Sequence, residues 1–347
     1  MDRHLIDINA TLREALKKLN DLSGATMTLF AIDSEGIMHG TITDGDIRRA
    51  VISGVDLEDA VHRAMHRNFS FLSSDGERVE HIRDARRRGI RLLPVLDRQR
   101  HLLSVVDLSH RISELPLSAV IMAGGKGERL RPLTLTTPKP LLEIGGKAII
   151  DYNVEALIRC GITDITVTTN YLAEKIEKHF DRAIDGVKVK CVREPLPLGT
   201  IGSAALADIP EQGNTLVMNS DLLTTISFED MYLHHRDSGC HITIAAIPYQ
   251  VSVPYAILTT SASTPELVTG LEEKPSYSYF ANAGIYIFPN HLLRALPSDV
   301  RTDATDLIAA AIDRGLKVTY FPINGTWIDI GSPTDFRQAA ELMKFKS

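Results

Sequence analysis

Near the middle of the chain, a glycine-rich turn is surrounded by cationic side chains. An apolar run over residues 119–123, typical of a strand buried on both faces, leads directly into the turn A-G-G-K-G-E-R-L-R-P-L-T. Glycines let the backbone bend sharply and bring its N–H groups close to an anion. The glycines are Gly124, Gly125 and Gly127, and the nearby cations are Lys126, Arg129, Arg131 and Lys139. We therefore expect this turn to bind a polyphosphate.

The spacing of these glycines excludes two common phosphate-binding motifs. The dinucleotide fingerprint requires G-x-G-x-x-G at the start of a helix, and the P-loop requires G-x-x-x-x-G-K-[ST]. Here the glycines lead into R-L-R-P, and Pro132 would interrupt a helix. The turn therefore belongs to another class of phosphate site.

The residues after the turn predict alternating helices and strands. The stripe of apolar residues over 149–158 predicts a helix that ends at Gly161. A strand over 164–169, a helix from 173 to about 183 and a strand over 187–192 follow. This alternation is typical of a parallel sheet with helices on its faces. Ligands of such sheets lie beyond the carboxyl ends of the strands, where the glycine turn is expected.

Two later segments place candidate site residues at the ends of strands. A buried strand predicted over 215–221 ends in Asp221, which either ligates a metal or is an ordinary turn residue. The segment Leu198–Ser203, L-G-T-I-G-S, is a second glycine turn that opens a helix. Both segments are candidates for the same cleft as the first glycine turn.

Composition and length narrow the class of protein. The 347 residues are enough for about two domains, and 44% hydrophobic with 24% charged residues is typical of a globular protein. No apolar run is long enough to span a membrane and no signal peptide is recognisable, so we expect a cytoplasmic protein. Cys160, Cys191 and Cys240 are widely separated, which predicts reduced thiols. A net charge of -6 argues against general nucleic-acid binding.

The glycine turn followed by P-K-P closely resembles the signature of the sugar-1-phosphate nucleotidyltransferases, also called NDP-sugar pyrophosphorylases. The resemblance covers residues 117–345 and implies an α/β fold with a Rossmann-like, mostly parallel sheet and helices on both faces. It implies that a sugar 1-phosphate attacks the α-phosphorus of a nucleoside triphosphate and that pyrophosphate leaves. Because the substrate itself is the nucleophile, catalysis would depend on alignment and charge neutralisation.

The resemblance also implies roles for the charged residues. Asp221 and Asp329, the latter in W-I-D-I-G, would hold a catalytic Mg²⁺ as the cofactor. Two phosphates repel each other strongly unless cations lie between them. The cations concerned are Lys126 and Arg129 for the triphosphate, and Lys139 and Lys274 for the two reacting phosphates.

Further motifs of the same family imply contacts to the base and the sugar. The L-G-T-x-G segment would lie beside the nucleotide base, because small residues let a flat base approach the backbone. The sugar would be contacted by the E-K-P and N-x-G-x-Y motifs and by a segment that resembles the Tyr-Gly step of the family. In this last segment, Ala256 stands where other members of the family have glycine. The residues concerned are Gly199, Thr200 and Gly202 for the base, and Tyr255, Glu273, Asn282 and Gly284 for the sugar.

The first third of the chain contains two similar units. In each, a helix-like segment precedes a strand, a polar turn and a second strand, over residues 11–47 and 79–108. Each unit ends with a hydroxyl residue three positions before an aspartate, Thr43 before Asp46 and Ser104 before Asp107. Such a repeat predicts a pseudo-symmetric module.

This module resembles a tandem pair of cystathionine-β-synthase-type (CBS) repeats. The resemblance implies an α+β domain over residues 1–115 that binds an adenine nucleotide or mediates homo-oligomerisation, followed by the transferase domain over residues 117–347. The ligand-binding residues would be Thr43, Asp46, Ser104 and Asp107. Alternatively, the two aspartates cap the helices that follow them.

The combination of a CBS pair with a short transferase resembles the glucosamine-1-phosphate guanylyltransferases of bacterial legionaminic acid biosynthesis and related mannose-1-phosphate guanylyltransferases. We therefore favour GTP and glucosamine 1-phosphate as substrates, with UTP, CTP, dTTP or mannose 1-phosphate as alternatives. We expect neither nucleic acid nor a membrane as a partner, and we expect a homo-oligomer formed through the CBS modules. An alternative of another class is a catalytically silent, nucleotide-sensing regulatory subunit, which should lack one of the charged site residues.

Overall fold

The computed structural model describes residues 2–22 and 26–344, which divide into two compact units at Leu115 and Pro116. The short segment Arg159–Gly161 belongs with the N-terminal unit. Within the described residues, no helix is long and apolar enough to cross a membrane.

The N-terminal unit contains two sheets of three strands, with the orders β1-β2-β3 and β4-β5-β6. In both sheets the first pair of strands is parallel and the second pair is antiparallel. Its elements are η1 (Asp2–His4, a 3-10 helix), β1 (Leu5–Asp7), α1 (Leu12–Asp21), β2 (Thr28–Ile32), β3 (Met38–Thr43), α2 (Asp44–Ile52), η2 (Val61–Arg63), β4 (Leu72–Ser73), α3 (Val79–Arg87), β5 (Leu92–Leu96) and β6 (Leu102–Asp107). The structure thus contains the repeated order of elements that the sequence predicts.

The strand register corrects how the two repeats correspond. The same irregularity follows the pair Ala31–Gly40 in the first sheet and the pair Val95–Ser104 in the second. Ser104 therefore corresponds to Gly40, and the prediction that it takes the place of Thr43 is wrong. The residue at the place of Thr43 is Asp107. The motif search failed here because it matched hydroxyl and carboxyl types and could not see the register of the strands.

The C-terminal unit is built on a seven-stranded sheet with the order β11-β10-β7-β12-β17-β14-β18. β17 runs antiparallel to both of its neighbours, and all other neighbouring strands are parallel. The elements are β7 (Leu117–Ala123), η3 (Glu128–Leu130), η4 (Leu133–Leu135), η5 (Lys139–Leu141), β8 (Glu143–Ile144), β9 (Lys147–Ala148), α4 (Ile149–Arg159), β10 (Ile165–Thr169), α5 (Ala173–His179), β11 (Lys190–Arg193), η6 (Gly202–Leu206), β12 (Asn214–Asn219), β13 (Leu222–Thr224), α6 (Phe228–Ser238), β14 (Ile242–Ser252), β15 (Ile257–Thr260), β16 (Val268–Glu272), β17 (Ser276–Pro289), α7 (Asn290–Arg294), α8 (Ala304–Asp313), β18 (Val318–Pro322), β19 (Trp327–Asp329) and α9 (Pro333–Lys344). The predicted mostly parallel α/β sheet is confirmed.

The central strands are buried on both faces, as their apolar runs predict. Val120 and Val217 of neighbouring strands pack with Phe288 of β17 and Ile308 of α8 in one hydrophobic cluster. These contacts fix the strand ends at which the site residues lie.

Two predicted elements differ in extent from the observed ones. The helix predicted to about residue 183 ends at His179, and β11 begins only at Lys190. Between them, Asp185 and Gly186 have φ angles of 46° and 79° and form a tight turn closed by Ile184 and Val187. An Asp-Gly pair is well suited to such a turn, which lies between the end of the helix and the start of the strand. The L-G-T-I-G-S segment opens into the 3-10 helix η6 and not into an α-helix.

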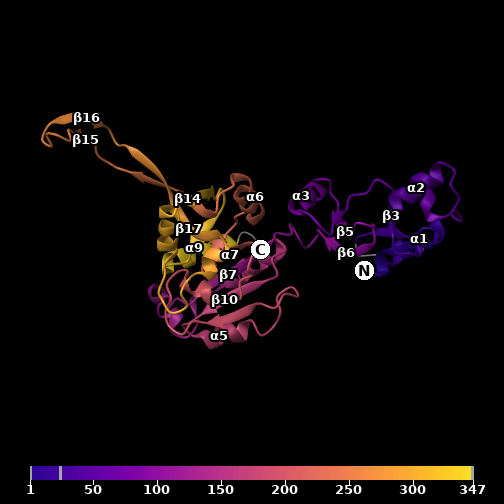
Figure 1. Cartoon of the computed structure of the whole chain (residues 1–347), viewed down its shortest axis with the longest axis horizontal. Coiled ribbons are helices and arrows are strands. Elements are labelled where there is room, and N and C mark those ends of the chain that lie inside the picture. The colour runs from indigo at the N-terminus through magenta and orange to yellow at the C-terminus, as the bar shows by residue number, and fades with distance from the viewer. Residues whose placement is uncertain (1, 23–25, 345–347) are drawn as a thin grey trace. The chain divides into compact units, whose positions relative to one another are not determined.

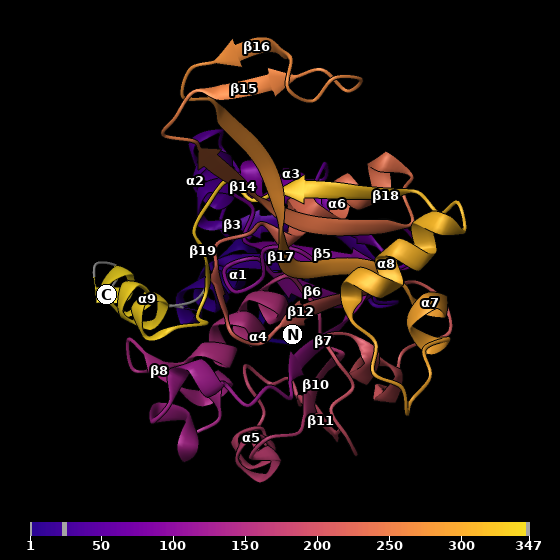
Figure 2. The ribbon, with the colours of Figure 1, turned by 90° about the vertical axis from the view of Figure 1, so that its left-hand side faces the viewer.

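Strands β14 and β17 continue past the sheet as a two-stranded ribbon that ends in the hairpin β15–β16. The pairing of the ribbon runs without interruption from Ala246–Asn282 to Ser252–Ser276. Figures 1 and 2 both show β15 and β16 standing off from the rest of the C-terminal unit. We call residues 247–281 the arm.

Candidate active site

Residues at the carboxyl ends of β7 and β12 line a cavity of about 360 Å³ in the C-terminal unit. The two strands are parallel neighbours, with Met122 opposite Asn219. The cavity lies where ligands of such sheets bind. Its lining residues are Met122, Gly124, Gly125, Lys139, Pro140, Glu194, Pro197, Leu198, Gly199, Thr200, Asn219, Ser220, Asp221 and Arg301. The two glycine turns and Asp221, which are far apart in the sequence, therefore share one cavity.

Asp221, Lys139 and Asp329 form one charged cluster at this cavity. The Lys139 ammonium donates to Asp221 Oδ2 and lies 3.6 Å from Asp329 Oδ1. The side chain of Lys139 is 12% exposed, and that of Asp221 is 22% exposed. Oδ1 of each aspartate is buried without a hydrogen-bond partner. Because buried polar atoms nearly always have partners, these two oxygens are ready to accept a ligand.

The two carboxylates of the cluster repel each other. Burial disfavours the ionised form of Asp329, and repulsion by Asp221 adds to this effect, so the pKa of Asp329 is raised. Attraction by Lys139 and Arg129 opposes the shift without cancelling it. A further cation at this point would relieve the repulsion.

Buried contacts behind the cluster hold both aspartates in place. β13 pairs with β19 so that Leu222 lies opposite Asp329, and the Ile330 N–H donates to the Asp221 carbonyl at 3.1 Å. The amide of Asn153 in α4 donates to the Leu222 carbonyl at 3.0 Å. The cluster therefore sits on paired strands and a buried helix, which limits its motion.

The cations of the glycine turn lie near the cluster but do not line the cavity. Arg129 follows Gly127, which has a φ of 59° and begins the 3-10 helix η3. A side chain at Gly331, two residues after Asp329 in the W-I-D-I-G segment, would approach the Arg129 guanidinium to 3.3 Å. Lys126 is exposed. Neither Lys126 nor Arg129 is among the residues that line the cavity of the described chain.

The glycines of the L-G-T segment have a structural reason in addition to the predicted contact with the base. Gly199 has a φ of 84°, and a side chain there would come within 2.5 Å of the Thr302 carbonyl oxygen. A side chain at Gly202 would likewise crowd Val300 and Thr302. The Thr200 N–H donates to Asp303 at 2.9 Å. Small residues are thus required where this segment packs on the residues before α8, although Gly199 and Thr200 also line the cavity.

Glu194 is a cavity residue that the sequence analysis missed. It follows β11, is 7% exposed, and accepts the Leu198 N–H at 3.2 Å. Burial raises the pKa of Glu194, although hydrogen bonds from Leu198, Thr168 and Ser203 oppose the shift. A side chain at Gly124 would come within 2.5 Å of Glu194 Oε1, so the glycine makes room for this carboxylate. Its signal in the sequence was an acidic residue at a strand end, four residues before L-G-T.

Of the residues predicted for the sugar, one pair lies beside the cavity. Gly284 has a φ of 72°, and a side chain there would come within 2.5 Å of the cavity residue Asn219. The Gly284 N–H donates to Asn282 Oδ1 at 2.9 Å, and Asn282 donates to the Tyr286 hydroxyl at 2.8 Å. This stretch of β17 therefore supports the cavity from behind.

The other residues predicted for the sugar are on the arm. Tyr255, Glu273 and Lys274 are exposed, and none of them is among the residues that line the cavity of the described chain. Lys274 has a φ of 45°, a left-handed conformation that is uncommon for a residue with a side chain. The structure thus separates these three residues from the cluster of Asp221, Lys139 and Asp329.

The family model described as "Nucleotidyl transferase" matches residues 118–344. The chain belongs to this family. This transferase is 32% identical over 227 residues to a protein of Danio rerio named mannose-1-phosphate guanylyltransferase catalytic subunit beta, covering 63% of this chain and 62% of that one. It is 33% identical over 242 residues to a mannose-1-phosphate guanyltransferase of Saccharomyces cerevisiae, covering 65% and 64%. The chain therefore spans less than two thirds of the length of these relatives.

A solved structure agrees with the fold of the transferase. The structure of HddC from Yersinia pseudotuberculosis complexed with GMP-PN matches with a TM-score of 0.51 and 25% sequence identity. The match covers 66% of this chain and 99% of that chain. The matched family region begins at residue 118, so the N-terminal unit lies outside it.

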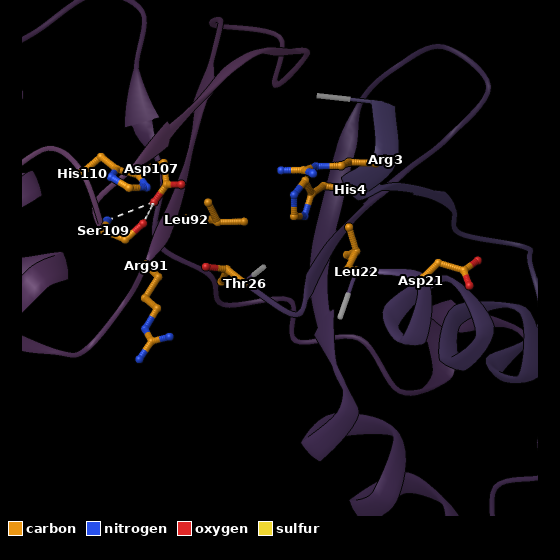
Figure 3. Close-up of a pocket in the computed structure, with 10 residues that line it drawn as sticks. All are labelled: Arg3, His4, Asp21, Leu22, Thr26, Arg91, Leu92, Asp107, Ser109 and His110. Carbon is orange, nitrogen blue, oxygen red and sulfur yellow. Dashed lines mark hydrogen bonds between the residues drawn. The ribbon is translucent and has the colours of Figure 1, made fainter. Parts of the chain in front are cut away.

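The N-terminal unit of the transferase contains a cavity of its own, of about 580 Å³. Figure 3 shows Arg3 and His4 on one side of it, with Asp107, His110 and Arg91 on the other. The remaining lining residues are Asp21, Leu22, Thr26, Leu92 and Ser109. The charged side chains of this lining are thus two arginines, Arg3 and Arg91, and two aspartates, Asp21 and Asp107.

The residues predicted to bind a ligand in the N-terminal unit have different positions. Thr43 and Asp46 form a reciprocal cap at the start of α2, with the Thr43 N–H donating to Asp46 at 2.8 Å. Ser104 is exposed and does not line the cavity described above. Asp107 lines this cavity and accepts hydrogen bonds from the Ser109 N–H and hydroxyl. Of the four residues, Asp107 alone is therefore at this cavity.

Proposed function

We propose that this transferase moves a nucleotidyl group from a nucleoside triphosphate to a sugar 1-phosphate, giving an NDP-sugar and pyrophosphate. The observation that carries the proposal is the cluster of Asp221, Lys139 and Asp329 at a cavity that also contains both glycine turns. The names of the curated relatives support the same reaction class. Pyrophosphate release that requires a sugar 1-phosphate tests it.

The chemical step needs no nucleophile from the protein. A phosphate oxygen of the sugar 1-phosphate forms a bond to the α-phosphorus, and the bond from that phosphorus to the bridging oxygen of pyrophosphate breaks. Both reactants are anions, so the protein must hold them in line and reduce their repulsion. Lys139 is already fixed between two carboxylates at the cavity, where it can contact both phosphates. Lys126 and Arg129 would hold the β- and γ-phosphates.

The residues at the cluster fit a magnesium ion. Mg²⁺ prefers oxygen ligands and is commonly held by one or two carboxylates together with substrate phosphates. Asp221 and Asp329 each present a buried Oδ1 without a hydrogen-bond partner, and their mutual repulsion favours a cation. These two residues would hold the ion, which when bound would neutralise charge on the reacting phosphates.

The base that fits the cavity best is guanine. The Watson–Crick edge of guanine presents two neighbouring donors, N1–H and the 2-amino group, and an ionised carboxylate accepts two such bonds side by side. Glu194 supplies a carboxylate at the part of the cavity formed by Leu198 and Gly199. Uracil, cytosine and thymine lack this pair of donors. We therefore propose GTP as the nucleotide.

Two sugar phosphates compete for the second substrate. The names of the relatives indicate mannose 1-phosphate, whereas the resemblance of the whole chain to glucosamine-1-phosphate guanylyltransferases of legionaminic acid biosynthesis favours glucosamine 1-phosphate. We retain glucosamine 1-phosphate as the proposed substrate and mannose 1-phosphate as the alternative. Comparing the two at equal concentration in the presence of GTP decides between them.

A regulatory role of the N-terminal unit is proposed in addition to catalysis. Arg3 and Arg91 provide positive charge around its cavity, and Asp107 provides an acceptor for ribose hydroxyls. Together with the resemblance to CBS pairs, this favours an adenine nucleotide, with its phosphate at the cations. A catalytically silent sensor is disfavoured because Lys139, Asp221 and the other charged site residues are all present.

We expect Arg91→Ala to weaken AMP binding to the full-length chain by about tenfold or more, because a charged hydrogen bond contributes about 1.5 to 3 kcal/mol. Titration calorimetry with AMP, which lacks a triphosphate, measures this. The matched control is Arg98→Ala, since Arg98 pairs with Asp75 and does not line the cavity. Equal AMP affinity in both variants and the unaltered chain would contradict this ligand site, and absence of AMP binding would leave the unit as a scaffold.

A further inference from the structure

The arm has an apolar face that the rest of the C-terminal unit leaves uncovered. In the ribbon, Tyr249 lies opposite Tyr279, and Val251 lies opposite Tyr277, so these four side chains share one face. The alternate positions carry Pro248 opposite Phe280, Gln250 opposite Ser278 and Ser252 opposite Ser276 on the other face, where the Phe280 ring centroid lies 4.5 Å from that of Tyr320 in β18. Alternation of this kind is typical of a sheet with one face packed and one face in water. Yet Tyr249 and Tyr279 are each 56% exposed.

Both edges of the ribbon are also unpaired. The neighbour of β14 on its outer side, β18, ends its pairing at Ala246, and the neighbour of β17, β12, pairs only as far as Ile285. An isolated two-stranded ribbon is at best marginally stable in water, and its open edges readily pair with another chain. The ribbon therefore requires a partner surface.

The tip of the arm continues the same pattern. Leu258 and Leu271 lie opposite each other in the hairpin and are 56% and 64% exposed. Eleven of the large hydrophobic side chains that are exposed in the described chain lie on the arm. Aromatic side chains bury roughly 150–250 Å² each, so the three tyrosines of this face on each of two arms together offer about 900–1,500 Å². Stable protein interfaces bury about 1,200–2,000 Å².

The course of the arm favours a second copy over the arm's own unit as the partner. The ribbon continues the strands of the central sheet in unbroken register, and the irregularity at Ile244–Ala246 lies before the ribbon begins. Folding the arm back onto its own unit would break these pairs. A symmetric exchange between two copies covers both arms without altering them, and it closes the assembly.

An exchange also explains where the E-K-P residues act. Glu273 and Lys274 are exposed on the arm, while the cavity of the same chain lacks them. We propose that two copies of this chain exchange their arms, each through the face of Tyr249, Val251, Tyr277 and Tyr279, and that each arm brings Glu273 and Lys274 to the sugar-phosphate side of its partner's cavity. The second half of this inference rests on the proposed function; the first half does not.

Light scattering on two matched variants tests the surface. Tyr279→Glu places a charge on the apolar face, and Ser278→Glu places the same charge on the polar face one residue away. We expect a dimer for the unaltered chain and for Ser278→Glu, and a dissociation constant raised at least 100-fold for Tyr279→Glu. A monomeric unaltered chain, or a dimer that Tyr279→Glu leaves intact, overturns the surface.

A mixed dimer tests the delivery of Lys274. Asp221→Asn and Lys274→Ala chains with different tags are co-expressed, and the doubly tagged dimer is purified. In this dimer one cavity has all its residues and receives an intact arm from the partner, so we expect about half of the unaltered activity, far above that of either parent homodimer. Activity no higher than that of the Lys274→Ala homodimer overturns delivery by the partner.

The two experiments separate this inference from the proposed function. Loss of the dimer in Tyr279→Glu supports the surface even if the unaltered chain releases no pyrophosphate. Unaltered activity in the Lys274→Ala homodimer overturns the role of the arm at the cavity while leaving the transferase reaction intact.

Discussion

Asp221→Asn and Asp329→Asn should each lower kcat for pyrophosphate release by about 1,000-fold. Both aspartates present a buried oxygen without a partner beside Lys139, and each amide keeps the shape of the side chain while removing its charge. Loss of a group that stabilises charge in the transition state costs about 100- to 1,000-fold, and loss of the proposed metal ligand adds to this. Steady-state assays at saturating substrate measure the effect.

Although Asp329→Asn should lower kcat, it should not lower the thermal stability of the chain. The pKa of Asp329 is raised by burial and by Asp221, so its ionised form is less favourable in the folded chain than in the unfolded chain at neutral pH. Removing the charge removes this penalty, and the melting temperature should be equal or higher. The control is Asp313→Asn at the exposed end of α8, which should keep full activity. Substantial turnover in both site variants would contradict the assignment of the cluster.

Glu194→Gln should reduce kcat/KM for GTP by about 10- to 150-fold, the cost of one charged hydrogen bond. The loss should be much smaller for ITP, because inosine lacks the 2-amino group that the proposed second bond requires. The glutamine oxygen can still accept the Leu198 N–H, so the turn that packs on α8 should remain in place. The ratio of kcat/KM for GTP to that for ITP is therefore the decisive readout.

The ratio of kcat/KM for GTP to that for ITP distinguishes recognition of the base by Glu194 from a structural role of this residue. Glu211→Gln, at an exposed acidic residue away from the cavity, is the matched control and should leave the ratio unchanged. If Glu194→Gln lowers kcat/KM for GTP, ITP and UTP by the same factor, the carboxylate only supports the loop and the guanine assignment fails.

The parts of the site that the sequence predicts are those that depend on residues close together in the chain. The glycine turn and Asp221 each follow an apolar strand directly, and neighbouring parallel strands necessarily bring their carboxyl ends together. Asp329 required the resemblance, because nothing local shows that β19 pairs with β13. The sheet class followed from the alternation of helices and strands.

The parts that the sequence did not predict depend on contacts between distant segments. Glu194 reaches the cavity because β11 ends close to Gly124, and Gly199 is small because it packs on Thr302. Ser104 was misplaced because residue types alone did not reveal the strand register. The E-K-P motif consists of neighbouring residues and can be recognised in the sequence. The course of β14 and β17, which carries this motif away from the cavity, depends on pairing between distant segments.

The most direct test of the account is pyrophosphate release with Mg²⁺ by the full-length chain, with each of GTP, UTP, CTP, dTTP and ATP crossed against glucosamine, N-acetylglucosamine, mannose and glucose 1-phosphates. The account predicts turnover that requires both substrates, with GTP dominant and glucosamine 1-phosphate preferred over mannose 1-phosphate. Silence across all combinations, from folded protein that still binds nucleotide, would contradict the proposed transferase and favour a regulatory subunit.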